Sequence, residues 1–395
     1  MTRRVPRWRE LRPLLQPRAP ELDPVKRAHT LRDLREAARK RVPRSVFDYV
    51  EGGADDEISL RRNRSAFERV EFSPQVLVGG DVSTATTILG RPATLPLVLA
   101  PTGYTRMMHH IGEPAVAVAA TQAGVPYTLS TMGTTAPEDL EGDNLWFQLY
   151  VWRDRGFTTD LIERARGAGY TALVLTVDTP VPGNRVRDVR NGLTLPPRLG
   201  IKTLLDGARK PRWWWNLLTT EPLRFATFDG DGSLAPSDIG TKMFDRNVTW
   251  ADVSWLRETW GGPLVVKGIQ SRPDAKRAAE AGADAIVLSN HGGRQLDRGP
   301  APLELVAPVA DEVGDRLEIY VDGGVRTGGD IAAAVGLGAK ACLIGRPYLY
   351  GLMAGGERGV ARAIAIVREE LERTMRLVGA TTVADLDREK VRLRA

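Results

Sequence analysis

The segment Ala283-Asp-Ala-Ile-Val-Leu-Ser-Asn-His-Gly-Gly-Arg-Gln-Leu-Asp297 joins a short apolar run to a loop rich in chemically active side chains. The run from Ala283 to Leu288 is typical of a strand buried in a parallel sheet. His291 and Arg294 follow that strand, separated by two glycines, and together could present a base and an anion-binding group to one small ligand. An ordinary turn could contain the same residues, so the rest of the chain must decide between a ligand-binding loop and a turn.

Seven further apolar runs of similar length precede or follow this one. In chain order they are 96–101, 125–129, 145–149, 172–177, 263–267, 317–321 and 341–344, with helical patterns at 112–124, 157–169, 273–282, 303–313 and 329–338. Apolar strands separated by helices predict a parallel sheet covered on both faces, and eight such units fit a (β/α)8 TIM barrel of the α/β class. A doubly wound open sheet is the alternative. The first strand, however, ends in Pro101-Thr-Gly103 and lacks the glycine-rich phosphate fingerprint expected there.

Two segments interrupt this pattern. Residues 1–29 form an Arg- and Pro-rich arm, and 30–39 and 42–54 then predict two helices at the start of a barrel domain spanning 30–395, the second stopped by Gly52-Gly53. The gap between the fourth and fifth strands, about 180–262, is long for such a connection, and we expect 190–250 to form a lid-like insertion. Its residues Trp213, Trp214 and Trp215 suit peripheral membrane contact, or packing on the barrel or a neighbouring subunit.

Composition excludes several functional classes. The net charge of +6 is carried mostly by arginine and is spread along the chain without a recognition motif, so we expect no nucleic-acid binding. The single cysteine, Cys342, excludes an intramolecular disulfide and a cysteine-cluster metal site. No metal is expected at His109 and His110 either, because no partner lies at ligand spacing; these two are expected to position the first loop, and His29 to lie on the surface. Without a membrane-spanning run or signal peptide, we expect a cytoplasmic protein, with peripheral contact at the inner face of the cell membrane through the tryptophans.

Polar groups follow nearly every predicted strand, at the end of the barrel where such folds carry their chemistry. They are Thr102 and Gly103, Ser130, Gln148 and Tyr150, Thr176 and Asp178, Lys267, His291 and Arg294, Asp322 and Arg326, and Gly345 and Arg346. A lysine that closes an apolar run requires a partner or an anionic ligand. The glycines and arginines of the last two loops predict a phosphate site, because backbone N–H groups and guanidinium groups bind phosphate.

Six motifs together resemble the FMN-dependent α-hydroxy acid dehydrogenase/oxidase family over about residues 30–385. They are Ser289–Asp297, Leu175-Thr-Val-Asp-Thr-Pro180, Trp146-Phe-Gln-Leu-Tyr150, Val266-Lys-Gly268, Asp322-Gly-Gly-Val-Arg326 and Ile344-Gly-Arg-Pro347. The arm, the Trp-rich insertion and residues 348–356 are most similar to bacterial quinone-linked L-lactate dehydrogenases. The resemblance implies an FMN cofactor and, as for the family, a homotetramer.

The resemblance also implies a role for each site residue. His291 would be the general base and Asp178 would stabilise its imidazolium form. The substrate would be held by Arg294, Arg185, Tyr49 and Tyr150, and Lys267 would face the N1/O2 edge of the flavin. The remaining flavin contacts would come from Pro101, Thr102, Gly103, Ser130, Gln148, Thr176 and Ser289, with Asp322, Gly323, Gly324, Val325, Arg326, Gly345 and Arg346 at the ribityl and phosphate groups.

Two positions depart from glycolate oxidase, which has Ala where this chain has Gly103 and Trp where it has Met132. Both changes are expected to leave space, so glycolate is not the expected substrate. The resemblance therefore implies oxidation of an L-2-hydroxy acid, with L-lactate as the first expectation, and electron transfer to a quinone. The alternatives are an O₂-dependent oxidase acting on mandelate or another larger acid, and a non-catalytic flavin- or phosphate-binding barrel. An FMN-dependent isomerase would lack the paired arginines.

Overall fold

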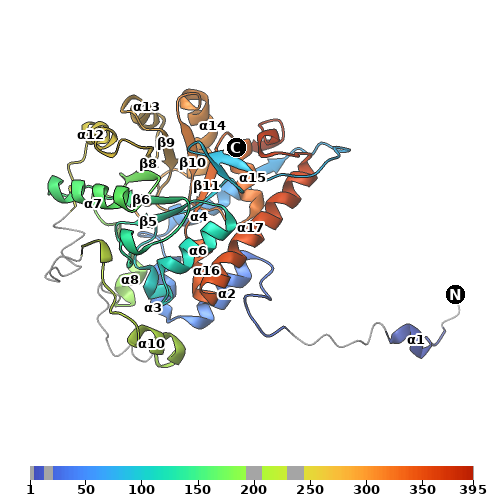
Figure 1. Cartoon of the computed structure of the whole chain (residues 1–395). Coiled ribbons are helices and arrows are strands. Elements are labelled where there is room, and N and C mark those ends of the chain that lie inside the picture. The colour runs from blue at the N-terminus through green and yellow to red at the C-terminus, as the bar shows by residue number, and fades with distance from the viewer. Residues whose placement is uncertain (1–3, 13–20, 193–206, 229–243, 395) are drawn as a thin grey trace.

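Eight parallel strands close into a barrel in the computed structural model, which describes residues 4–12, 21–192, 207–228 and 244–394 (Figure 1). The strands are β4 (Leu97–Leu99), β5 (Tyr127–Ser130), β6 (Leu145–Leu149), β7 (Ala172–Thr176), β8 (Leu264–Ile269), β9 (Ala285–Leu288), β10 (Glu318–Val321) and β11 (Ala341–Ile344). Their order around the barrel is the chain order, and β11 pairs with β4 to close the ring. The predicted TIM barrel is confirmed, and each of its strands overlaps the predicted run.

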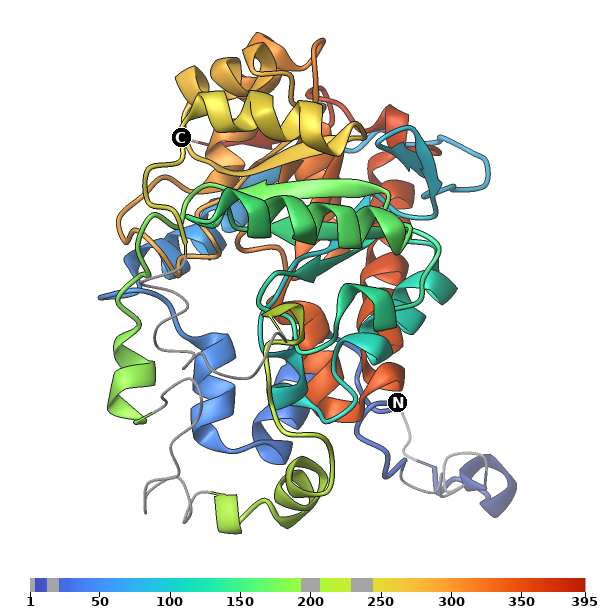
Figure 2. The same cartoon turned by 60° about the vertical axis from the view of Figure 1, so that its left-hand side comes forward.

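Helices cover the outside of this ring (Figure 2). They are α6 (Glu113–Ala123), α7 (Arg155–Gly167), α12 (Trp250–Trp260), α13 (Arg272–Glu280), α14 (Pro302–Val313), α15 (Gly328–Gly336), α16 (Arg346–Gly355) and α17 (Glu357–Val378), with α5 (Thr105–Met108) preceding α6. Successive side chains of β7 point alternately into the barrel and toward the helices, and both sides are buried, which explains why the strand sequences are continuously apolar. Val174 belongs to one buried cluster with Val265 and Val287 of the next two strands, whereas its neighbours Leu173 and Leu175 belong to the cluster shared with the helices.

A hairpin covers the N-terminal end of the barrel. It consists of β2 (Thr86–Ile88) and β3 (Arg91–Ala93), and its Ile88 is fully buried within the inner cluster. The Leu89 N–H donates to the carboxylate of Glu318, the first residue of β10, at 3.1 Å. A second small sheet pairs β1 (Val70–Phe72) with β12 (Val391–Leu393). The C-terminal end of the strands is therefore the end left for chemistry.

An N-terminal extension contributes α1 (Trp8–Leu11), α2 (Leu31–Arg41), α3 (Arg44–Glu51) and α4 (Ile58–Glu68). The glycine pair after α3 ends the helix, but Gly52 has an extended backbone instead of a left-handed cap. Its neighbour Gly53 is required for a different reason: a Cβ there would lie 2.8 Å from the carbonyl oxygen of Gly293. The extension is thereby brought into contact with the loop that follows β9.

The long insertion after β7 contains α8 (Val186–Arg190) and α10 (Pro211–Leu218), and both views place these helices beside α3 at one side of the molecule (Figures 1 and 2). Within 190–250, residues 193–206 and 229–243 lie outside the described residues. The predicted tryptophan segment forms α10. Of the helices in the described ranges, none combines the length and apolar character needed to cross a membrane.

Candidate active site

One cavity of about 510 Å³ opens at the C-terminal end of the barrel. Its lining contains every predicted site residue except Asp178 and Ser289. Those two lie directly behind the lining, where Asp178 contacts His291 and Ser289 contacts Lys267. Strand ends far apart in the sequence are thus brought together as expected. Tyr49 of α3 and Arg185 before α8 join them from outside the barrel.

His291 and Asp178 form a pair across two strand ends. The histidine Nδ1 lies 3.1 Å and 3.3 Å from the two carboxylate oxygens of Asp178, and the histidine side chain is 23% exposed, toward the cavity. His291 has a left-handed backbone with φ of 57°, and its N–H donates to Ser289 Oγ at 3.0 Å. Such strain in a residue other than glycine is concentrated at functional sites.

Burial lowers the pKa of His291, an effect that the Asp178 carboxylate opposes and Lys267 reinforces; the net direction is downward. Burial alone would raise the pKa of Asp178, but the attraction of His291, its hydrogen bond and the charge of Lys267 together outweigh burial and lower that pKa. Near neutral pH the pair is therefore a neutral imidazole beside a carboxylate. This arrangement suits a general base whose second nitrogen, Nε2, is left for a substrate.

A bulge in β8 makes the close approach of Asp178 feasible. The register of β8 and β9 shifts between Lys267 and Ile269, and Gly268 there has φ of 111°. A Cβ on Gly268 would lie 2.8 Å from the Cβ of Asp178, so only glycine fits without displacement. The strand also continues past Lys267 to Ile269, which corrects the prediction that the lysine closes the run.

Lys267 is buried, and its ammonium group binds two side chains. Its Nζ lies 3.0 Å from Asp322 Oδ2 and donates to Ser289 Oγ at 3.0 Å, with only 4% of the side chain exposed. Burial lowers the pKa of Lys267, but Asp322 and Asp178 outweigh it and raise the pKa overall. A permanent positive charge therefore stands on the cavity wall, where it can stabilise negative charge on a ligand.

Two arginines flank Tyr49 in the same cavity. The Cζ atoms of Arg294 and Arg185 lie 5.0 Å and 6.0 Å from the centre of the Tyr49 ring. Arg294 donates to the carbonyl oxygen of Gly52 at 3.1 Å, whereas Arg185 Nε is buried without a partner in the described chain. Burial, reinforced by Arg185, lowers the pKa of Arg294 to about 9. Two neighbouring guanidinium groups at one cavity, one of them with a buried Nε that has no partner in the described chain, favour an anion, and a carboxylate matches their geometry.

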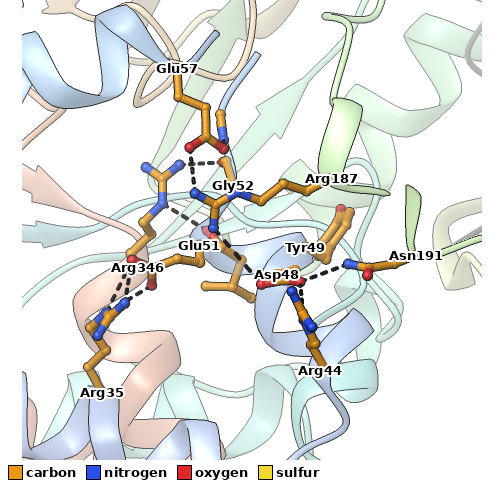
Figure 3. A network of polar contacts seen from close by, with 12 residues as sticks. Arg35, Arg44, Asp48, Tyr49, Glu51, Gly52, Glu57, Arg187, Asn191 and Arg346 are labelled. Carbon is orange, nitrogen blue, oxygen red and sulfur yellow. Dashed lines mark hydrogen bonds and ion pairs between the residues drawn. The ribbon is translucent and has the colours of Figure 1, made fainter. Parts of the chain in front are cut away.

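A polar network holds this substrate side of the cavity (Figure 3). Asp48, next to Tyr49 on α3, accepts hydrogen bonds from Asn191 Nδ2 at 2.9 Å and Arg44 Nε at 3.3 Å. Arg187, two residues after Arg185, forms an ion pair with Glu57. Helix α3 and the start of the insertion are therefore tied together, which fixes the tyrosine and the arginine relative to each other.

The cofactor side of the cavity carries buried polar atoms that no residue in the described chain satisfies. They are Gln148 Nε2, Thr176 Oγ1 and Asp322 Oδ1. Gln148 Oε1 is already used, because it accepts from Ser130 Oγ at 3.0 Å, which directs its amide N–H₂ elsewhere. Buried polar groups are normally paired, so these atoms fit a ligand that offers several hydrogen-bonding groups. A flavin with a ribityl chain is such a ligand.

The glycine-rich loops provide a cradle beside those atoms. Gly323 and Gly324 have φ of 83° and 97°, and a Cβ on Gly324 would lie 2.4 Å from the carbonyl oxygen of Asn63 in α4. Helix α16 begins with Gly345 as its N-cap, so its first backbone N–H groups and its positive dipole end are available to a phosphate. These features fit the phosphate of FMN.

The Arg346 side chain makes contacts that the sequence did not indicate. Its guanidinium donates to three backbone carbonyl oxygens, those of Val50 at 2.8 Å, Gly52 at 2.8 Å and Gly292 at 2.9 Å. These bonds connect the start of α16 to α3 and to the loop that carries His291, and Figure 3 shows the bond to Gly52. The proposed phosphate contact at this position thus stays a prediction, alongside a structural role that the sequence did not indicate.

An apolar wall completes the cavity. Phe225 packs edge-on against Tyr104 at 4.4 Å, and Phe244 lies 4.8 Å from Tyr150, measured between ring centres. Both phenylalanines come from the insertion and were missed, because a long irregular segment gives no periodicity from which to place them. The space expected beside Gly103 is also absent, since a Cβ there would lie 2.9 Å from the Cβ of Met132. Met132 occupies that place.

The other histidines lie apart from this cavity. His109 and His110 stack on each other with ring centres 4.6 Å apart at the end of α5, and His29 is exposed. Burial lowers the pKa of His109 to about 4, so its ring is neutral. Within the described ranges no three His, Cys, Asp or Glu side chains gather in a way that could hold a metal ion.

Comparisons with known proteins agree with this geometry. The family model described as FMN-dependent dehydrogenase matches residues 38–393. The chain is 50% identical to a putative L-lactate dehydrogenase of Mycobacterium tuberculosis, over 98% of this chain and 95% of that protein. It is 41% identical to an L-lactate oxidase of a Nostoc species, over 89% and 94% of the two chains.

Among solved structures, a monotopic membrane protein, (S)-mandelate dehydrogenase, superposes with a TM-score of 0.90 at 36% identity, covering 93% of this chain and all of the other. The match with the family model takes in the barrel, the histidine–aspartate pair and the cofactor side of the cavity. The chain belongs to the FMN-dependent dehydrogenase family and is an FMN-dependent 2-hydroxy acid oxidoreductase.

Proposed function

We propose that this enzyme oxidises L-lactate to pyruvate and passes the electrons to a quinone. The observation that carries the proposal is the facing of two pairs across one cavity: His291 with Asp178, and Arg294 with Arg185. The carboxylate of a 2-hydroxy acid can bind the two arginines. The adjacent carbon carries the C–H and O–H groups from which oxidation removes two protons and two electrons, and it would lie beside His291.

The binding step uses the arginines and tyrosines. Arg294 and Arg185 receive the substrate carboxylate, which offsets their mutual repulsion and the burial of the Arg294 charge. Tyr49 and Tyr150 donate hydrogen bonds to the carboxylate or the hydroxyl. Burial raises the pKa of Tyr150 above its ordinary value, so its phenol keeps the proton that it donates. Fixing both ends of a small molecule in this way brings its reacting carbon beside the histidine.

The chemical step uses His291. Because Nδ1 is held by Asp178, the Nε2 atom takes the proton from the substrate, and the Asp178 carboxylate stabilises the imidazolium that results. When bound, FMN would accept the two electrons, and the unsatisfied polar atoms and glycine loops of the cofactor side would hold it. The positive charge of Lys267 on the cavity wall would stabilise negative charge on such a cofactor.

L-lactate is the first choice because the relatives that share most of this chain include L-lactate dehydrogenases. Phe225, Phe244 and Met132 would give its methyl group an apolar wall. The names of the related proteins also leave mandelate as a candidate substrate, since a mandelate dehydrogenase occurs among them beside the L-lactate dehydrogenases. An O₂-dependent oxidase is the second candidate, and the similarity to an L-lactate oxidase favours it. The ratio of hydrogen peroxide formed to quinone reduced under air separates the two acceptors.

Peripheral membrane contact through α10 is part of the proposal. Trp213 is not available for it, because its Nε1 donates to the Met107 carbonyl oxygen at 3.0 Å and the ring packs on the body of the protein. Trp215 and Leu218, both 71% exposed, form the outer face beside the exposed Arg212. Vesicles containing anionic lipid should bind the wild type and release a Trp215→Ala/Leu218→Ala variant, whereas Leu377→Ala, at another exposed leucine, should bind normally. Equal binding by all three proteins would refute the contact.

A cytoplasmic homotetramer completes the proposal. The mass of one chain is 43.3 kDa, so light scattering of the purified protein should report about four times that value. A mass near one chain would refute it. The division into an arm of residues 1–29 and a barrel domain of 30–395 is also proposed. Val25 and Ala28 at the end of the arm are buried, so removal of residues 1–20 is the truncation that should leave flavin binding intact.

The experiment that tests the function is anaerobic reduction of the purified holoprotein by a panel of 2-hydroxy acids. L-lactate should bleach the flavin absorbance, D-lactate should not, and (S)-mandelate should act more slowly than L-lactate. Faster reduction by (S)-mandelate would overturn the choice of lactate. A protein that binds no FMN, or whose flavin no L-2-hydroxy acid reduces, would overturn the function and leave a binding barrel.

A further inference from the structure

Two loops carry the four residues of the proton-transfer pair, His291 and Asp178, and of the carboxylate-binding pair, Arg294 and Arg185. The loop of residues 178–185, after β7, carries Asp178 at its start and Arg185 at its end. The loop of residues 289–297, after β9, carries His291 and Arg294. Each loop thus supplies one half of the proton-transfer pair and one half of the carboxylate-binding pair, so the geometry of both pairs depends on how the loops are aligned with each other.

The side chain of Gln295 spans these two loops. Its Nε2 donates to the carbonyl oxygens of Asp178 at 3.1 Å and Val181 at 2.9 Å, and its Oε1 accepts from the Gly183 N–H at 3.1 Å. The residue is 7% exposed. Both amide hydrogens and the amide oxygen are therefore used on one backbone segment of the opposite loop, a set of contacts that only an amide of this length can make.

The loops meet at close range beside this amide. A Cβ on Gly183 would lie 2.2 Å from the carbonyl oxygen of Arg294 and 2.8 Å from the Cα of Gln295. Glycine at position 183 permits the approach, and the three hydrogen bonds fix the register of one loop on the other. A shift of either loop would move Asp178 relative to His291, or Arg185 relative to Arg294.

We propose that Gln295 is a positioning residue that aligns both pairs by holding loop 178–185 against loop 289–297. Gln295 lines the cavity, but the three hydrogen bonds of its amide all go to the backbone of loop 178–185, so it acts through the residues of that loop. Its two donor bonds lie on the Asp178 side of the loop and its acceptor bond lies on the Arg185 side. The two halves of the amide therefore serve different pairs.

Two variants separate these halves. Gln295→Met has nearly the same length and no amide, so it removes all three bonds. Gln295→Glu keeps an oxygen acceptor for the Gly183 N–H and loses both donors. Leu296→Ala is the matched control, because Leu296 is the next residue of the same loop and is 67% exposed. The readouts are the FMN content, the rate constant for anaerobic flavin reduction by L-lactate, and the dissociation constant of D-lactate from its perturbation of the flavin absorbance.

Gln295→Met should retain FMN, lose flavin reduction by about 10²-fold and bind D-lactate more weakly, since misplacement of about 1 Å has effects of that size. Gln295→Glu should lose reduction by a similar factor while its D-lactate affinity stays nearer the wild type. Leu296→Ala should match the wild type throughout. A residue that serves only packing would not produce this separation of rate from affinity.

Two results would overturn the inference. One is wild-type reduction and D-lactate binding in both Gln295 variants with FMN bound. The other is loss of FMN and of cooperative unfolding in both variants but not in Leu296→Ala, which would assign the amide to the fold as a whole. The inference rests on the roles proposed for the two pairs, but its failure is distinct. If the proposed function fails, the wild-type flavin is not reduced at all. If only the inference fails, the wild-type flavin is reduced, and the two Gln295 variants either are reduced at the same rate or have lost their FMN.

Discussion

Replacing Asp178 by asparagine tests the electrostatic pairing at the centre of the site. The carboxylate lies 3.1 Å from His291 Nδ1 and its side chain is only 2% exposed, so solvent screens the pair little. At an effective dielectric constant of about 20, two unit charges at that distance attract by about 5 kcal/mol. Asparagine keeps the shape and a hydrogen-bond acceptor but loses the charge, and a retained hydrogen bond is worth about 1 kcal/mol.

The difference of about 4 kcal/mol is available only when His291 is protonated, which is the state formed as it takes the substrate proton. Asp178→Asn should therefore slow anaerobic flavin reduction by L-lactate by about 10³-fold, since each 1.36 kcal/mol corresponds to about tenfold in rate. Because Asp178 raises the pKa of His291, its loss should also move the acid limb of the pH–rate profile to lower pH.

Stopped-flow absorbance of the holoprotein measures both effects. FMN content should be unchanged, because Asp178 lies behind the cavity lining. Asp56→Asn is a suitable control, since that carboxylate is 73% exposed and outside the cavity. Reduction within about tenfold of the wild type, with FMN bound, would refute the electrostatic reasoning.

Three further predictions follow from the same geometry. Gly268→Ala should slow flavin reduction without removing any polar group, because its Cβ would press on Asp178, and an unchanged rate would contradict the role of the bulge in β8. Lys267→Met should slow reduction by about 10²-fold or more and lower the flavin midpoint potential, measured by redox titration, since the positive charge is lost beside Asp322; an unchanged potential would count against it. In the wild type, kcat/KM should be constant at neutral pH and fall only in acid, with a base pKa below 6.5, because burial lowers the pKa of the histidine; a base pKa of 7 or above would contradict this.

Much of the fold follows from local pattern. Each barrel strand is buried on both faces, so its sequence is continuously apolar, and eight such runs with intervening helices leave few alternatives. The residues at the strand ends were predictable for the same reason, because parallel strands present their C-terminal ends on one side. His291, Asp178 and Lys267 were located in this way, and the resemblance to a family supplied their roles.

Other parts of the site depend on contacts between distant segments and left no local signal. The three carbonyl oxygens bound by Arg346 belong to α3 and to the loop after β9, and nothing near Arg346 in the sequence indicates them. Phe225 and Phe244 reach the cavity from an insertion without periodicity. Gly103 suggested open space, yet whether a glycine leaves space or accommodates a neighbour depends on the position of Met132, which sequence does not provide.

The central claim is that His291 is the base of an L-2-hydroxy acid oxidation, and anaerobic flavin reduction in His291→Ala tests it most directly. The wild-type flavin should be bleached by L-lactate and not by D-lactate. The variant should keep its FMN and D-lactate binding, because the cofactor side and the arginines are untouched, yet show almost no reduction by L-lactate. Reduction of the variant at the wild-type rate would contradict the account.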